Sequence, residues 1–138
     1  MISNERLKAL LAEENLTCVL SDGNRLIKSR ERGVKPLIGF IESGKSFKGF
    51  TAADKVVGKA AALLYALMGV SSLYASVISE GALTVCKSFG ISVEYGTLTQ
   101  NIINRRGDGF CPMEQAVADI SDPQTAFNAV KEKLKNLS

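Results

Sequence analysis

The sequence contains no histidine and no tryptophan among its 138 residues. Histidine is the usual general base beside a serine or cysteine nucleophile, and it is the commonest metal ligand in proteins. Ser-His and Cys-His catalysis from within this chain are therefore excluded. A zinc site that contains histidine is excluded on the same ground.

Cysteine is also scarce, with three residues and no close pair among them. An odd number without pairing favours free thiols, so we expect a reducing, cytoplasmic location. The longest apolar run, residues 60–68, is far shorter than the roughly 20 residues of a membrane span. The first residues enter an amphipathic pattern directly, and we therefore expect no signal peptide and no membrane partner.

Charge of either sign is modest, with 22% charged residues and a net charge of +3. The lysines and arginines form no block, so we expect no nucleic-acid partner. The basic sign does suit a small anionic ligand. An apolar content of 46% over 138 residues is enough for one core, which predicts a single domain over residues 1–138.

The stretch that organises the sequence is residues 51–68, for which we predict one long helix. Thr51 is a suitable cap, and Asp54 stands three residues later, where a capping-box carboxylate belongs. Residues 60–68 are apolar on all sides, so this half must be buried. The polar first turn, with Asp54, Lys55 and Lys59, is a candidate place for a site.

The remaining elements follow from periodicity and turn signals. We predict a first helix from Ser3 or Asn4, a hairpin of strands 17–20 and 25–29, strand character at 36–41, a strand at 72–79, a helix at 80–89, a strand at 91–98, and helices from Pro112 to about Ile120 and from Asp122 onward. Strand, helix and strand over residues 72–98 form a parallel βαβ unit. The fold class is therefore α/β, a three-layer α/β/α domain. Its mixed sheet begins as a hairpin and continues as parallel strands around a central buried helix.

Residues 39–46 match the phosphate-loop pattern G-x-x-x-x-G-K-S. A true phosphate loop needs a strand before it and a helix that begins at Gly-Lys-Ser. Here residues 47–50 separate the match from the next predicted helix, so we interpret it as a mobile loop. Lys45 and Lys48 remain candidate contacts for an anion.

Cys111 is the cysteine with the surroundings of a reactive thiol. Pro112 at the first helical position makes Cys111 the N-cap, and Arg105 and Arg106 lie just upstream. A helix N-terminus and nearby arginines lower the pKa of a thiol. The alternative is that Cys111 only packs a loop against the body. Cys18, in a strand, and Cys86, on an apolar helix face, are predicted core residues.

Two further groups are candidates for ligand binding. Asn104, Arg105 and Arg106 stand in a polar, glycine-containing loop that can surround a carboxylate or phosphate. A solvated turn is the alternative. Ser79 and Glu80 follow a strand at its carboxyl end, where open α/β sheets bind ligands.

The order of elements resembles the cytidine-deaminase-like fold. Residues 53–61 (A-D-K-V-V-G-K-A-A), 78–80 (I-S-E) and 104–114 (N-R-R-G-D-G-F-C-P-M-E) resemble a small uncharacterised prokaryotic family of that fold. The resemblance covers nearly the whole chain. It implies an architecture more than an activity.

Zinc deaminases of this fold carry a His or Cys beside a catalytic Glu, and a Pro-Cys-x-x-Cys motif at the next helix. Ala52-Ala53-Asp54 and Ser79-Glu80 stand at those places here. The resemblance therefore implies a zinc-independent protein with no metal and no cofactor. Its pocket would be lined by Asp54, Ser79 and Glu80.

Three hypotheses follow. The first is an enzyme that binds a small anionic or nucleoside-like molecule, with Asp54 as anchor or general base, Cys111 as nucleophile, and Arg105 and Arg106 as anion clamp. The second is a non-catalytic nucleotide or metabolite sensor. The third is a redox thiol protein that uses Cys111 and Cys86. We also expect a homo-oligomer, because the exposed parts of a small α/β domain often pair.

Overall fold

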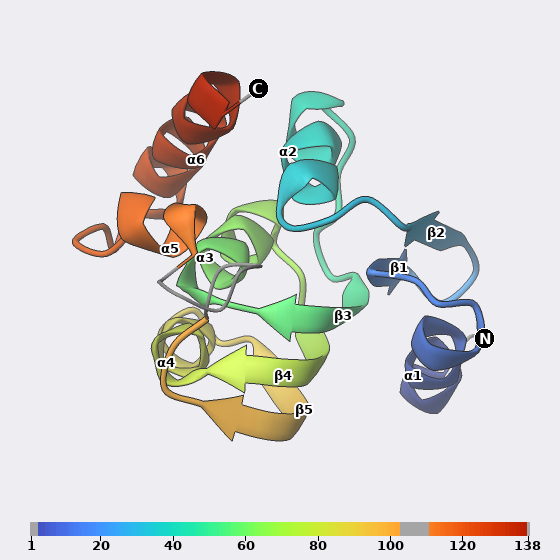
Figure 1. Cartoon of the computed structure of the whole chain (residues 1–138). Coiled ribbons are helices and arrows are strands. Elements are labelled where there is room, and N and C mark those ends of the chain that lie inside the picture. Colours follow the sequence, from blue (N-terminus) through green and yellow to red (C-terminus); the bar gives the residue numbers. More distant parts are fainter. Residues whose placement is uncertain (1–2, 103–110, 138) are drawn as a thin grey trace.

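Five strands form one mixed sheet in the order β2-β1-β3-β4-β5 in the computed structural model, which describes residues 3–102 and 111–137 (Figure 1). The strands are β1 (Cys18–Ser21), β2 (Leu26–Ser29), β3 (Thr51–Val57), β4 (Ser72–Ser79) and β5 (Ser92–Thr99). The helices of the described residues are α1 (Asn4–Glu13), α2 (Lys35–Glu42), α3 (Lys59–Met68), α4 (Glu80–Ser88), α5 (Pro112–Ala116) and α6 (Pro123–Leu137).

The sheet changes character at β3. Strand β1 is antiparallel to both β2 and β3, whereas β3, β4 and β5 are parallel. The predicted hairpin followed by parallel strands is therefore confirmed. So is the βαβ unit made of β4, α4 and β5.

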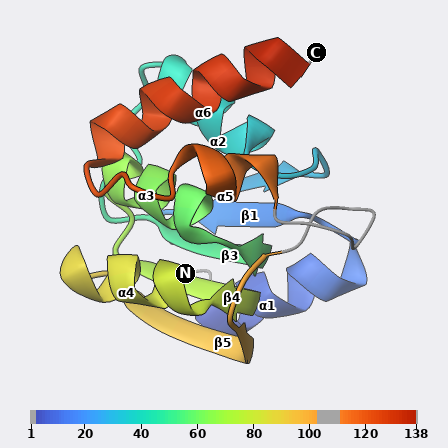
Figure 2. The same ribbon diagram turned by 60° about the vertical axis from the view of Figure 1, so that its left-hand side comes forward.

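Helices cover the two faces of the sheet unequally (Figure 2). Helix α1 packs its leucines Leu7, Leu10 and Leu11 against Val19 and Ala53 on one face. The other helices lie on the opposite face, where α3 is central and is contacted by α2, α4, α5 and α6. The predicted buried helix is thus confirmed for residues 59–68. No helix in the described part of the chain is long and apolar enough to cross a membrane.

The single long helix predicted for residues 51–68 is wrong in its first half. Residues 51–57 form β3, and Gly58, in an extended conformation with φ −94° and ψ −179°, is the N-cap of α3. Strand β3 pairs with β1 on one side and β4 on the other, so its backbone is satisfied within the sheet. This pairing outweighs the helix propensity of its alanines. Asp54 is therefore not a helix cap.

The strand character predicted for residues 36–41 is also wrong. They belong to α2, which has Pro36 in its first turn and buries Pro36, Leu37 and Ile38. Gly39 lies inside this helix, and no helix begins at Gly44, Lys45 and Ser46. The phosphate-loop match is therefore incidental, because its first half has no loop with which to surround a phosphate.

Candidate functional site

A cavity of about 240 Å³ lies beside the carboxyl-terminal half of β3. Strand β1 begins at Cys18, opposite Asp54, so Val56 and Val57 have only β4 as a paired strand. The connection from β2 to α2, the N-terminus of α3 and the residues around the start of α5 close the space. Its lining includes Arg32, Asp54, Val56, Ala61, Cys111 and Glu114.

Asp54 is the buried carboxyl group of this cavity, with 8% of its surface exposed. The Tyr65 hydroxyl, on α3, donates a hydrogen bond to Asp54 Oδ2 at 2.6 Å. The Val56 backbone N–H donates a weaker one to Oδ1 at 3.3 Å. Burial raises the pKa of Asp54 to about 7, although these hydrogen bonds favour the ionised form. Asp54 can therefore accept or release a proton near neutral pH.

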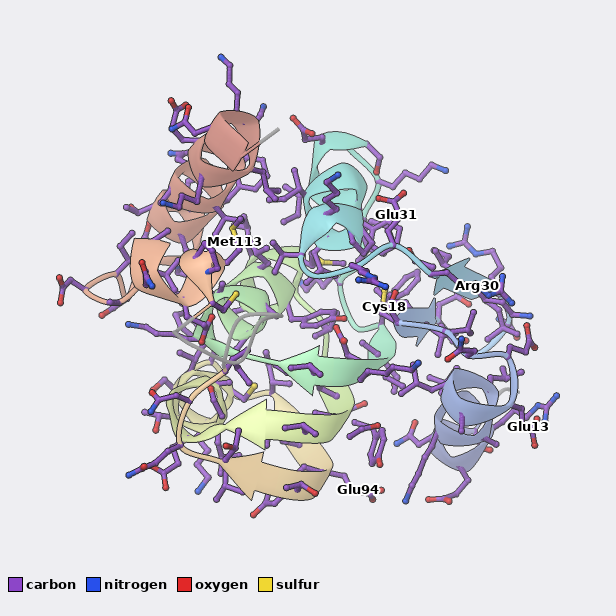
Figure 3. The ribbon with its side chains drawn as sticks, viewed as in Figure 1. Glu13, Cys18, Arg30, Glu31, Glu94 and Met113 are labelled. Atoms are coloured by element: carbon purple, nitrogen blue, oxygen red, sulfur yellow. The ribbon has the colours of Figure 1, made fainter. Side chains whose placement is uncertain are left out.

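Cys18 and Tyr65 complete a buried group around this carboxyl. Cys18, labelled in Figure 3, lies on β1. It is the sheet partner of Asp54. Burial raises the pKa of the Cys18 thiol well above its usual value, with a further contribution from the Asp54 charge. Burial and the same charge raise the pKa of Tyr65. Both groups stay protonated at neutral pH, so Asp54 is the member of the three that titrates there.

Glu114 of α5 covers the N-terminus of α3. Its carboxylate accepts hydrogen bonds from the backbone N–H of Lys59 at 2.7 Å and of Ala60 at 2.8 Å. A Cβ atom at Gly58 would lie 2.6 Å from this carboxyl group, so the glycine leaves room for it. Lys59 Nζ also donates to the Ala118 carbonyl at 3.0 Å. The first two free amides of α3 are therefore hydrogen-bonded by a carboxylate from within the chain.

The role of Glu114 was missed from the sequence, because it stands 55 residues from Lys59. One signal was present. Gly58 precedes an apolar helix and offers no side-chain oxygen as a cap. A helix start without a local cap indicates an acceptor from elsewhere in the chain.

Cys111 is the N-cap of α5, as the sequence predicts, and is half-buried in the lining of the same cavity as Asp54. Its side chain makes no capping hydrogen bond. Helix α5 has only five residues, and its acidic residue Glu114 reaches α3 instead. The structure thus brings Cys111 and Asp54 to one cavity, while activation of this thiol by a helix dipole has little support.

The other predicted ligand-binding residues do not join this cavity. The Ser79 hydroxyl is buried and accepts from the Ala82 backbone N–H at 3.1 Å, so it caps α4. Glu80 and Lys45 are exposed. The cavity lining includes none of the three.

Asn104, Arg105 and Arg106 lie outside the described residues. Among the described ones, Arg32 and Lys55 are the cations in the lining, and sequence reasoning missed Arg32. Lys55 Nζ donates to Asn15 Oδ1 at 2.7 Å. Within residues 3–102 and 111–137, no three acidic or cysteine side chains gather as a metal-binding group.

Cys86 is buried in the main core, and burial raises its pKa to about 11. It does not line the cavity with Cys111. The redox-thiol hypothesis, in which Cys86 would resolve Cys111, gains no support from this arrangement.

The fold and this cavity define an α/β domain with a small pocket at the carboxyl end of a sheet strand. Residues 6–134 match the family described as TM1506, a domain of unknown function, DUF1893, and the chain belongs to that family. It is similar to the crystal structure of a DUF1893 family protein, TM1506, from Thermotoga maritima. The identity is 25% and the TM-score 0.82, over 99% of this chain and 92% of that one. No curated protein matches the sequence.

We expect Asp54→Asn to change how stability depends on pH. Folded Asp54 keeps its proton up to a pKa of about 7, whereas its ordinary value is 3.8. Between these values the folded state binds more protons than the unfolded state. The free energy of unfolding therefore falls as pH rises from about 4 to 7, by roughly 4 kcal/mol at 1.36 kcal/mol per unit. The variant lacks this decline, which urea unfolding at several pH values would detect.

Asp22→Asn is the matched control for this experiment. Hydrogen bonds from the Arg25 and Asn24 backbone lower the pKa of Asp22 to about 2. The contribution of Asp22 to the free energy of unfolding is therefore lost only as pH falls toward 2, and Asp22→Asn should keep the wild-type decline between pH 4 and 7. A constant difference between the wild type and Asp54→Asn from pH 4 to 7 would contradict the assignment.

We also expect Gly58→Ala and Glu114→Ala to be non-additive. Glu114→Ala removes two hydrogen bonds to the α3 amides, at a cost of about 1–3 kcal/mol. Gly58→Ala displaces the same carboxylate and should cost a similar amount. In the Glu114→Ala background it has nothing to displace, so it should add less than about 1 kcal/mol. Urea unfolding of the four proteins measures the coupling, and simple additivity of the two costs would refute the contact.

Proposed function

We propose that this protein binds a small, ring-sized polar molecule in the cavity beside Asp54. The observation that carries the proposal is the buried carboxyl group of Asp54 in the wall of a 240 Å³ cavity. A dry cavity of about 150 Å³ holds benzene, so this one has room for a single substituted ring. Most of the wall is apolar, including Val34, Ala60 and Met113, as in many small-molecule sites.

The chemistry of Asp54 indicates what part of the ligand it would meet. Its carboxyl group donates a hydrogen bond when protonated and accepts when ionised. With a pKa near 7 both forms are available, which suits the N–H and C=O edge of a nucleobase-like ring. Arg32 in the lining would face an anionic substituent, because Lys55 Nζ already donates to Asn15 Oδ1 and Glu114 already occupies the Lys59 and Ala60 amides of α3. We therefore favour a nucleoside-like ligand over a free anion.

The cytidine-deaminase-like fold is part of this proposal. Zinc deaminases of that fold place metal and catalytic Glu at the start of the core helix. Here that helix begins at Gly58-Lys59-Ala60, so the alignment of Ala52-Ala53-Asp54 with that position was shifted by several residues. The Glu114 carboxylate covers the helix start, which supports zinc-independent function.

A catalytic role is the second candidate. A carboxyl group with a pKa near 7 is suited to general acid–base catalysis at neutral pH, and the Cys111 thiol borders the same cavity. The first candidate needs binding alone, as in a sensor. The two differ in turnover, not in where the ligand would sit.

We expect nucleosides or nucleobases to raise the thermal unfolding midpoint of the wild type. The stabilisation should reach about 2.7 kcal/mol at a ligand concentration of 100 Kd. Val56→Trp should abolish the shift, because Val56 is 48% exposed at the cavity wall and a larger side chain there would fill the opening. Differential scanning fluorimetry with a panel of bases, nucleosides and mononucleotides would measure the effect.

Leu26→Trp is the matched control, since Leu26 is an exposed strand residue outside the cavity lining. It should respond to ligand as the wild type does. No shift with any member of the panel, or an equal shift in Val56→Trp, would overturn the proposed site. Cys111→Ser separates the two candidates, because a sensor keeps its full response and an enzyme loses turnover.

A further inference from the structure

Strand β5 forms one edge of the sheet, and no described element lies beyond it (Figures 1 and 2). Its inner edge pairs with β4 from Ser72↔Ser92 to Ser79↔Thr99. Six of its eight residues are exposed, and the other two are half-buried. Tyr95 and Leu98 are each 41% exposed. The outer edge of β5 therefore presents a row of backbone donors and acceptors to solvent.

The opposite edge of the sheet is protected in ways that β5 is not. Strand β2 has four residues, is flanked by Arg25 and Arg30, and carries Lys28 paired with Glu14 at 2.9 Å. Short length and positive charge are common protections against edge pairing. Strand β5 has eight residues, no proline and no lysine. Its one charge, Glu94 (Figure 3), is paired with Lys8 of α1 at 3.6 Å.

We propose that β5 pairs antiparallel with β5 of a second copy of this chain, which joins two sheets into one. Two identical strands related by a two-fold axis place one residue opposite its own copy. The sequence S-V-E-Y-G-T-L-T accommodates that axis at Gly96, where no side chain can clash. The pairing would add up to about eight inter-chain backbone hydrogen bonds, roughly one per residue pair.

The register set by Gly96 places no like charges opposite each other within β5. Tyr95 lies opposite Thr97 of the second copy, an aromatic and β-branched pair of the kind that stabilises antiparallel strands. Glu94 lies opposite Leu98 of the second copy, so the two carboxylates do not meet. Lys8 balances the charge of Glu94 within each copy. The two edges therefore approach each other without net charge.

Pairing of β5 with β5 of a second copy fits the structure better than pairing of β5 with β2 of a second copy. Pairing β5 with β2 of another copy would join eight residues to four and would continue without closure into a filament. The accessible surface of the chain is 7544 Å². A standard interface covers about a tenth of the surface of a small protein. Phe89, 47% exposed directly after α4, follows the helix that packs on β5 and would extend the contact beyond the strands.

Charge substitutions at Leu98 test both the interface and its register. Leu98→Glu brings a second carboxylate opposite Glu94 of the other copy, whereas Leu98→Lys brings a cation there. We expect a dimer for the wild-type full chain, at least an about tenfold higher dimer dissociation constant for Leu98→Glu, and a change of less than about threefold for Leu98→Lys. Sedimentation equilibrium over an about hundredfold concentration range measures all three.

Leu26→Glu, on the β2 edge, is the control and should remain dimeric. Circular dichroism and thermal unfolding of each variant establish that it is folded. Leu98→Glu and Leu98→Lys both remove the apolar leucine side chain, so a difference between them reports the charge. A monomeric wild type overturns the proposal. So does a Leu98→Glu protein that dimerises as the wild type does, and so does equal dissociation of both Leu98 variants.

Discussion

The hydrogen bond between Tyr65 and Asp54 is the interaction on which the site depends. It holds a carboxyl group between the sheet and the central helix, joining Asp54 of β3 to Tyr65 of α3 at 2.6 Å. A buried carboxyl group is stable only when its polar atoms are satisfied, and both oxygens here accept hydrogen bonds. Burial still outweighs these bonds and moves the pKa of Asp54 close to neutral pH. The same carboxyl group borders the cavity, so Asp54 is both buried in the protein and within reach of a molecule in the cavity.

A second carboxylate, that of Glu114, limits the ligand chemistry that we propose for the cavity. Because it accepts hydrogen bonds from the Lys59 and Ala60 amides, these two donors are not available to a ligand anion. The described lining that remains is mostly apolar, with the Asp54 carboxyl group, the Cys111 thiol and Arg32, while Lys55 Nζ is bonded to Asn15. In our proposal, this combination suits a nucleoside-like ring better than a free anion. Glu114 also holds α5, and with it Cys111, against the start of α3.

Local signals in the sequence were sufficient for α1, the hairpin, and the βαβ unit from Ser72 to Thr99. They failed where long-range pairing decides, because the alanines and the Thr51–Asp54 spacing imitate a capped helix while two neighbouring strands hold β3 extended. Asp54 and Cys111 were predicted to share a site and do line one cavity, although Asp54 belongs to a strand. Ser79 caps α4, a role its position before Glu80 predicts, but it does not line the cavity. The contact between Glu114 and Lys59 spans too much sequence to be predicted.

The most direct test of this account is a carbon-13 NMR titration of the Asp54 side-chain carboxyl group in the folded protein. The account predicts a midpoint at about pH 7, set by burial beside Tyr65. A midpoint close to 3.8, the ordinary value for an aspartate, would show that the group is ionised and hydrated at neutral pH. That result would contradict a buried, titrating carboxyl group as the centre of the site.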